Sequence, residues 1–212
     1  MSEPVKPTRT YRSERRREQA LETRGRVLDA AWAVFVERGY GGATIRAIAT
    51  EAGVAPETIY AGFGTKRDLL AETLSRAVRG DDPAPVLEQA GPRAVADEED
   101  PREKLRLFAT DISARLERAG PIMNVLASAA AEEPELESLH ARMHGARRSN
   151  LRTVAESLHD AGALSGDVES ATDTIWALTS PELFMLLRTT RGWARRTYAR
   201  WLEETLARLV LQ

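Results

Sequence analysis

Two histidines, His140 and His144, are the residues whose types and spacing most directly suggest chemistry. Four residues make about one turn of a helix, so both imidazoles would lie on one face and could share a metal ion. A third ligand on that face would be Glu137 or Glu133. Pairs of this kind in a charged helix are more often ordinary surface residues, so we expect no metal.

Other catalytic chemistry has little support in the sequence. The absence of cysteine excludes disulfides, thiolate nucleophiles and thiolate zinc sites. There are three histidines, none in a recognisable triad, and there is no Gly-rich phosphate loop. We therefore expect neither an enzyme nor a cofactor.

The composition is that of a soluble globular protein, with 42% hydrophobic and 29% charged residues among 212. No apolar run approaches the roughly 18 residues that a membrane helix needs. The basic N-terminus has no apolar core behind it, as a secretion signal would. We expect a cytoplasmic protein that does not bind membranes.

The net charge of −2 conceals an asymmetry along the chain. Residues 1–67 carry 12 basic and 8 acidic side chains, a net +4, and the remainder carries 18 and 24, a net −6. A basic N-terminal part followed by an acidic C-terminal part suggests that the N-terminal part binds a polyanion. A solvated helix with mixed charges would give the same count.

Apolar residues recur at helical spacing nearly throughout, which predicts an all-α fold. A first helix with the apolar face Val27, Leu28, Ala31, Val34 and Phe35 should stop at the stretch Gly39-Tyr40-Gly41-Gly42. Four further residues predict the next boundaries. Thr44 caps a second helix, Gly53 ends it, Pro56 opens a third, and Thr65 caps a fourth.

Two short helices joined at Gly53 fit the helix-turn-helix, whose second helix enters the major groove of DNA. The third predicted helix is too short to be stable alone. It leaves Pro56, Glu57, Thr58 and Ala61 facing outward. Such a face makes sense when a scaffold presents it to a partner.

From about Arg24 to Leu70 the sequence resembles the TetR family of bacterial transcriptional regulators. The stretches that carry the resemblance are "RVLDAAWAVFVERGY", "ATIRAIATEAGV" and "ETIYAGFGTKRDLL". The resemblance implies an N-terminal three-helix DNA-binding domain and a C-terminal helical domain for ligand binding and dimerisation. It also implies a homodimer, which a two-fold palindromic operator in double-stranded DNA requires.

The resemblance places DNA contacts on several residues of this chain. Thr44 and Lys66 match positions that bind phosphate, and Thr58 and Tyr60 match positions that contact phosphates or bases. Thr44 is in any case an N-cap, and Tyr60 could be a packed structural residue. By helical phase Arg46 faces outward, which favours a bidentate contact to guanine over a backbone contact.

The predicted recognition helix departs from the family pattern. It has Ala61-Gly62 where an aromatic or histidine pair is common, and no Arg, Lys, Asn or Gln between Ala55 and Phe63. Glu57 could accept from a cytosine amine, and Thr58 or Ala61 could touch a thymine methyl group. We hypothesise that specificity depends on Arg46, DNA shape and the basic extension "TYRSERRREQ". That extension is either an arm on the DNA or a prolongation of the first helix.

The expected domain organisation has four parts: a basic extension (1–21), a helix-turn-helix domain (22–80, motif about 45–64), a loop or mobile link (81–100) and a regulatory and dimerisation domain (101–212). In the last we expect helices at about 101–118, 121–131, 134–161, 167–190 and 194–211, with Pro181 kinking or dividing the fourth after Ser180.

The C-terminal domain should hold an apolar small-molecule effector among its middle helices. The candidate lining residues are Phe108, Ile112, Met123, Leu126, Met143, Trp176, Phe184 and Met185. Each taken singly could equally be core. We therefore expect a repressor that the effector releases from its operator. The rival classes are an all-helical enzyme and an adaptor that binds protein, whose interface would be less sensitive to salt than a DNA complex.

Overall fold

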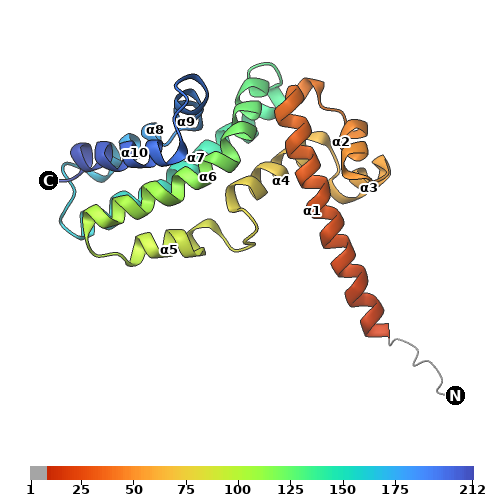
Figure 1. Cartoon of the computed structure of the whole chain (residues 1–212), viewed down its shortest axis with the longest axis horizontal. Coiled ribbons are helices and arrows are strands. Elements are labelled where there is room, and N and C mark those ends of the chain that lie inside the picture. Colours follow the sequence, from red (N-terminus) through yellow and green to blue (C-terminus); the bar gives the residue numbers. More distant parts are fainter. Residues whose placement is uncertain (1–8) are drawn as a thin grey trace. The chain divides into compact units, whose positions relative to one another are not determined.

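The computed structural model describes residues 9–212, with side chains from Arg15 onward, and every regular element in that range is a helix (Figure 1). An isolated bridge joins Leu164 to Leu211. The predicted all-α fold is therefore confirmed. Within the described range, no helix is both long and apolar enough to cross a membrane. The chain divides into two compact units, one up to Thr73 and one from Leu74.

The first unit contains α1 (Arg9–Gly42), α2 (Ile45–Ala52), α3 (Pro56–Phe63) and the start of α4 (Lys66–Arg79). Gly39 interrupts α1 with a φ of 67°, a conformation that glycine adopts without steric cost. The predicted apolar face of α1 is confirmed, because all five of its members are buried. The other helices of the unit contribute further buried residues: Ile45 and Ile48 from α2, Ile59 from α3, and Leu69 and Leu70 from α4.

The predicted helix boundaries in this unit are also confirmed. Thr44 is the N-cap of α2, and its Oγ1 accepts a hydrogen bond of 3.1 Å from the Ala47 N–H. Gly53 ends α2 in the left-handed conformation (φ 65°, ψ 40°), and Pro56 is the first residue of α3. Thr65 starts α4, where its Oγ1 accepts from the Asp68 N–H at 3.1 Å. Capping residues thus set both ends of α2 and the start of α4, and a proline opens α3.

The second unit is built around one long helix, α6 (Pro101–Ala130), which contacts α5, α7, α9 and α10 (Figure 1). Helix α7 packs in turn on α8. The other elements are η1 (Val86–Glu88), α5 (Ala90–Asp97), α7 (Pro134–Asp160), α8 (Val168–Leu178), α9 (Pro181–Met185), the π-helical turn η2 (Leu186–Thr190) and α10 (Arg195–Val210). The unit begins inside α4, a few residues before the domain end predicted at residue 80.

The expected loop over residues 81–100 is wrong in its second half, where η1 and α5 form. Buried polar side chains hold this segment at both ends. The Gln89 amide donates to the carbonyls of Arg79, Asp82 and Ala84 over 3.1 to 3.3 Å. At the other end the buried Lys104 ammonium donates to the Val95 and Ala96 carbonyls and to Ser157.

The boundary predicted before Pro121 is likewise wrong, because α6 continues through that proline. An interior proline removes one backbone hydrogen bond at a cost of about 3 kcal/mol. Helix α6 packs on α9 and α10, and Gly120, next to this proline, lies against Met185 and Phe184 of α9. The division at Pro181 is confirmed: α8 ends at Leu178, and Ser180 caps α9 by accepting from the Leu183 N–H.

Candidate functional site

Helix α3 presents a polar outer face while a single side chain anchors it. Ile59 is fully buried, whereas Glu57, Thr58 and Ala61 are exposed and 57% of Tyr60 is accessible. Pro56, also predicted to face outward, is half-buried at the start of the helix. An eight-residue helix held in this way carries its polar residues outward on a rigid support.

Thr44 and Arg46 both lie exposed at the start of α2. The Thr44 hydroxyl caps the helix, and the free N–H groups of a first turn suit an anion such as phosphate. The Arg46 guanidinium forms no hydrogen bond or ion pair with the side chains described from Arg15 onward or with the backbone of residues 15–212. Its side chain is therefore available to a partner.

Lys66 has contacts inside the unit that the sequence did not reveal. Its ammonium donates to the Tyr40 carbonyl at 2.9 Å and to the Ala43 carbonyl at 3.3 Å. It also lies 4.0 Å from the centre of the Tyr40 ring, within the range of a cation–π interaction. Lys66 thus fastens the turn after α1 to the start of α4, in addition to the phosphate contact that we predict for it.

Arg24 is a positioning residue that sequence reasoning missed. From α1 its Nε donates to Glu72 at 2.8 Å and its Nη1 donates to the Gly62 carbonyl at 3.0 Å. The guanidinium also lies 4.3 Å from the centre of the Phe63 ring. Its three partners lie 38 or more residues away in the sequence, so no local sequence pattern predicts these contacts. The structure alone shows that Arg24 fixes the end of α3.

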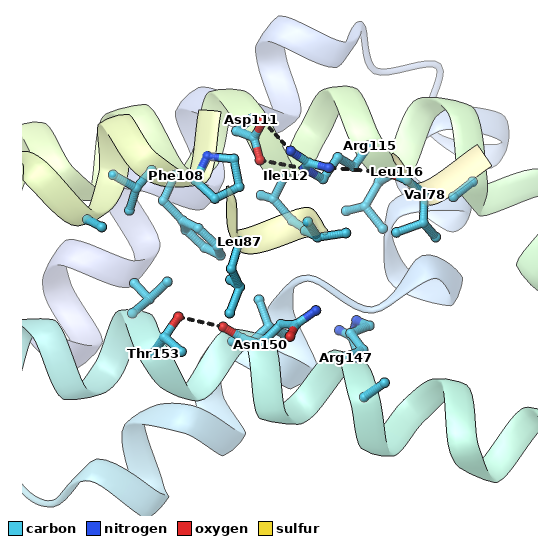
Figure 2. A pocket seen from close by; sticks show the side chains of 18 of the residues that line it. Val78, Leu87, Phe108, Asp111, Ile112, Arg115, Leu116, Arg147, Asn150 and Thr153 are labelled. Atoms are coloured by element: carbon cyan, nitrogen blue, oxygen red, sulfur yellow. Dashed lines mark hydrogen bonds and ion pairs between the residues drawn. The ribbon is translucent and has the colours of Figure 1, made fainter. Parts of the chain in front are cut away.

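A cavity of about 350 Å³ in the second unit is the candidate ligand pocket. Figure 2 shows α6 contributing Phe108, Ile112 and Leu116 to one wall, with Leu87 between α6 and α7. The pocket contains four of the eight predicted lining residues, Phe108, Ile112, Met123 and Met143. Most of the remaining lining is apolar: Val78, Val86, Pro92, Val95, Ala96, Ala119, Ala146, Leu151 and Val154.

The other four predicted lining residues lie elsewhere. Leu126 is buried in the core, and Phe184 packs on Tyr198 with 4.8 Å between ring centres. Met185 approaches Gly120, since a Cβ placed on that glycine would be 3.2 Å from the Met185 sulfur. Trp176 lies beside His144, with 5.6 Å between the ring centres.

Two arginines reach the pocket in different electrostatic states. Arg115 is paired with Asp111, with 2.7 Å between Nε and Oδ2 (Figure 2). Its Nη1 donates to Gln89 at 2.8 Å. Arg147 donates through Nη2 to the Trp176 carbonyl and, at 3.1 Å, to Thr179. Its Nε and Nη1 are buried without a hydrogen-bond partner among the described residues.

Arg147 is half-buried, and its guanidinium lies 5.1 Å from the centre of the Trp176 ring with two buried donors left unpaired among the described residues. Burial lowers the pKa of its guanidinium to about 10, although Glu182 acts in the opposite direction. A buried charge without full hydrogen bonding is costly, and an anionic group would relieve that cost. Arg147 is therefore the strongest polar feature of the pocket.

The two histidines on α7 do lie together, but their nearest carboxylate differs from both predicted candidates. The Nε2 atoms of His140 and His144 are 3.0 Å apart, and Glu182 of α9 completes the group. Burial lowers the pKa of His144, with further contributions from His140 and Arg147. The carboxylate near the two histidines is thus neither Glu133 nor Glu137, because it comes from another helix, about 40 residues further along the chain.

A Gly turn between two short helices, with a polar outer face on the second, defines the first unit as a helix-turn-helix domain. Residues 27–73 match the family model described as bacterial regulatory proteins, tetR family. The first unit is therefore similar to the DNA-binding domain of the TetR family, as the sequence suggested.

The wider comparisons give relatives with similar descriptions. The chain is 29% identical over 140 residues to the HTH-type transcriptional repressor NicS of Pseudomonas putida, covering 66% of this chain and 59% of that protein. A putative TetR-family regulator from Mesorhizobium loti has a similar structure (TM-score 0.69, 20% identity, 91% of this chain and 98% of that one). FadR of Bacillus subtilis, in complex with stearoyl-CoA, matches with a TM-score of 0.69 at 20% identity, over 85% and 96% of the two chains.

Proposed function

We propose that this protein is a transcriptional repressor that binds a palindromic operator in the bacterial cytoplasm and is released from it by a small molecule. The observation that carries the proposal is the exposed polar face of α3, presented by a TetR-type domain whose turn is fixed at Gly53. The description of NicS as a repressor supports the same direction of action.

On the operator, Arg46 makes the main base contact, to the O6 and N7 atoms of a guanine. Thr44 and Lys66 bind phosphate, while Thr58 and Tyr60 approach the groove from α3. Glu57 is the acceptor on α3 that suits a cytosine amine. Because α3 has few groups able to read bases, DNA shape supplies part of the specificity.

The basic start of the chain adds an electrostatic contribution to binding. Helix α1 already begins at Arg9, which favours a prolonged helix over an extended arm, while residues 1–8 lie outside the described range. Arg15, Arg16 and Arg17 are exposed on that helix. Deleting residues 1–19 should lower both the affinity and its dependence on salt; unchanged values would contradict this contribution.

The repressor acts as a homodimer formed through η2 and α10. These elements contact each other, and each exposes a leucine, with 54% of Leu186 and 56% of Leu209 accessible. Exposed leucines on adjacent helices suit a symmetric interface between two copies. Leu209→Glu should give monomers in sedimentation equilibrium, whereas a dimer that persists in both Leu209→Glu and Leu186→Glu would place the interface elsewhere.

The effector occupies the cavity between α6, α7 and the η1–α5 segment. The size and apolar walls of this cavity suit a small apolar molecule. The unsatisfied Arg147 donors favour an effector with one anionic group, such as an apolar carboxylic acid. The description of FadR as a complex with stearoyl-CoA supports the binding of a small molecule by a protein of this fold.

Release follows from a shift in population. An effector that prefers the chain conformation with low operator affinity raises the fraction of molecules in that conformation. Helix α4 carries the coupling, because it begins in the DNA-binding unit and its Val78 lines the pocket. The effector must bind the two conformations with different affinities for this coupling to exist.

Selection from a pool of random duplexes at two salt concentrations tests DNA reading. Enrichment of a palindrome is the expected result. Binding that weakens equally for all sequences as salt rises would leave a non-specific DNA binder. Binding to no duplex would favour the adaptor alternative.

A matched pair of probes tests the effector class. Medium-chain fatty acids and the corresponding alcohols would be titrated into the operator complex, with release followed by fluorescence anisotropy. The acids should release the DNA more effectively, and Arg147→Met should remove that advantage, whereas Arg142→Met on the same helix should retain it. Equal potency of acids and alcohols would exclude the anionic class.

A further inference from the structure

His140, His144 and Glu182 converge at one point of the second unit. One potential ligand atom from each lies within 4.8 Å of the others, and the two imidazole Nε2 atoms are 3.0 Å apart. The histidines are one turn apart on α7, and Glu182 is in the first turn of α9. Two separate helices therefore contribute to the cluster.

The dimensions of the cluster suit a transition metal. Zinc binds imidazole nitrogen and carboxylate oxygen at about 2.0 to 2.2 Å, so two ligand atoms at a tetrahedral angle lie roughly 3.3 Å apart. The observed 3.0 Å between the two nitrogens is close to that value. Two histidines four residues apart on one helix are also a recurrent way to hold zinc.

The surroundings of the cluster leave it both ordered and accessible. His144 contacts His140 and Trp176 edge to face, with 4.4 Å and 5.6 Å between ring centres, and these contacts restrict its ring. Both histidines are half-buried, whereas Glu182 is exposed. An ion can therefore arrive from solvent, and a water molecule can complete its coordination.

We propose that His140, His144 and Glu182 bind one divalent transition-metal ion, with zinc as the best fit to two imidazoles and a carboxylate. The ion links α7 to the start of α9 through three protein ligands and keeps one position for water. The alternative arrangement is a direct N–H···N hydrogen bond between the two imidazoles, which needs no metal.

Cobalt(II) titration of the full-length, chelator-treated protein distinguishes the two arrangements. We expect intense visible absorption from a four-coordinate cobalt site, saturating at one ion per chain and displaced by zinc. His144→Ala should abolish the absorption. Glu182→Gln, a change at an exposed position that should leave the fold intact, should raise the cobalt dissociation constant about tenfold or more.

Two variants serve as matched controls. Glu137→Gln removes an exposed carboxylate of α7, and His159→Ala removes the exposed histidine near the end of that helix. Both should titrate like the unmodified protein, and zinc should raise the melting temperature of both. Failure to bind cobalt, or equal weakening by Glu137→Gln and Glu182→Gln, would overturn the proposal.

Discussion

Arg24 and Glu72, 48 residues apart in the sequence, form a hydrogen-bonded ion pair with 2.8 Å between Nε and Oε1. The pair joins α1 to α4, and the same guanidinium holds the Gly62 carbonyl and the Phe63 ring at the end of α3. Phe63 is only half-buried, so α3 depends on Arg24 as well as on its anchor Ile59. Arg24 therefore positions the proposed recognition helix from inside the first unit.

Arg24→Ala should destabilise the first unit by about 1 to 2 kcal/mol, since a half-exposed ion pair and a cation–π contact each contribute about 0.5 to 1 kcal/mol. Thermal unfolding followed by circular dichroism measures the effect. Operator affinity should fall together with the stability of the first unit. Arg26→Ala, which removes a nearby exposed arginine, should change neither quantity; equal effects of the two substitutions would mean that general charge is responsible.

Arg46→Ala should weaken operator binding by about 1 to 3 kcal/mol, roughly 5-fold to 150-fold, because a bidentate contact to guanine contributes that much discrimination. The substitution removes no contact within the described chain, so the melting temperature should stay the same. Selection from random duplexes should show relaxed preference at one base pair of each half-site. Uniform weakening across all sequences would instead identify Arg46 as a phosphate contact.

The stability of the first unit should depend on Asp68 in acid. Hydrogen bonds from the Thr65 hydroxyl and N–H lower the pKa of this carboxyl below its ordinary value of 3.8. Its contribution to stability is therefore present above the unfolded-state pKa and is lost as the pH falls through the lower folded-state pKa.

The melting temperatures of the unmodified protein and Asp68→Asn, measured across the acid range, check this dependence. The difference between them should be largest near neutral pH and should shrink below about pH 4. Because other carboxyls titrate in both proteins, their effects cancel in the difference. A difference that does not vary with pH would show that the ionised carboxylate adds nothing.

Gly91→Ala should destabilise the second unit by about 1 to 3 kcal/mol, the usual cost of overpacking. A Cβ at this position would lie 2.1 Å from Oδ1 of Asp111, which is itself paired with Arg115. Gly145→Ala is the control, since no heavy atom lies within 4 Å of the position of its Cβ. That exposed helical site should gain up to about 1 kcal/mol in chemical denaturation.

Local chemistry made the first unit largely predictable from the sequence. Thr44, Gly53, Pro56 and Thr65 act on neighbouring backbone groups, so their sequence positions fix where helices begin and end. The same holds for Pro181 in the second unit. Contacts across the fold, such as those of Arg24 and Lys66, could not be predicted because their partners lie far away in sequence.

The second unit shows where tertiary packing outweighs local signals. Pro121 predicted a helix start, yet packing carries α6 through it. The acidic segment before residue 100 predicted a loop, yet Gln89 and Lys104 stabilise helical structure there. Because the sequence does not predict α5, it places the pocket among α6, α7, α8 and α9, and four of the eight predicted lining residues lie elsewhere.

The Gln89 side chain has a mechanical consequence. Its amide group donates to the carbonyls of Arg79, Asp82 and Ala84, and its oxygen accepts from the Arg115 guanidinium. These hydrogen bonds restrict the conformations of the chain that follows α4. The segment between α4 and Gln89 is therefore rigid, and it carries Leu87, which lines the cavity. A molecule that displaces Leu87 must therefore also shift the last turn of α4, because the segment between them cannot absorb the displacement.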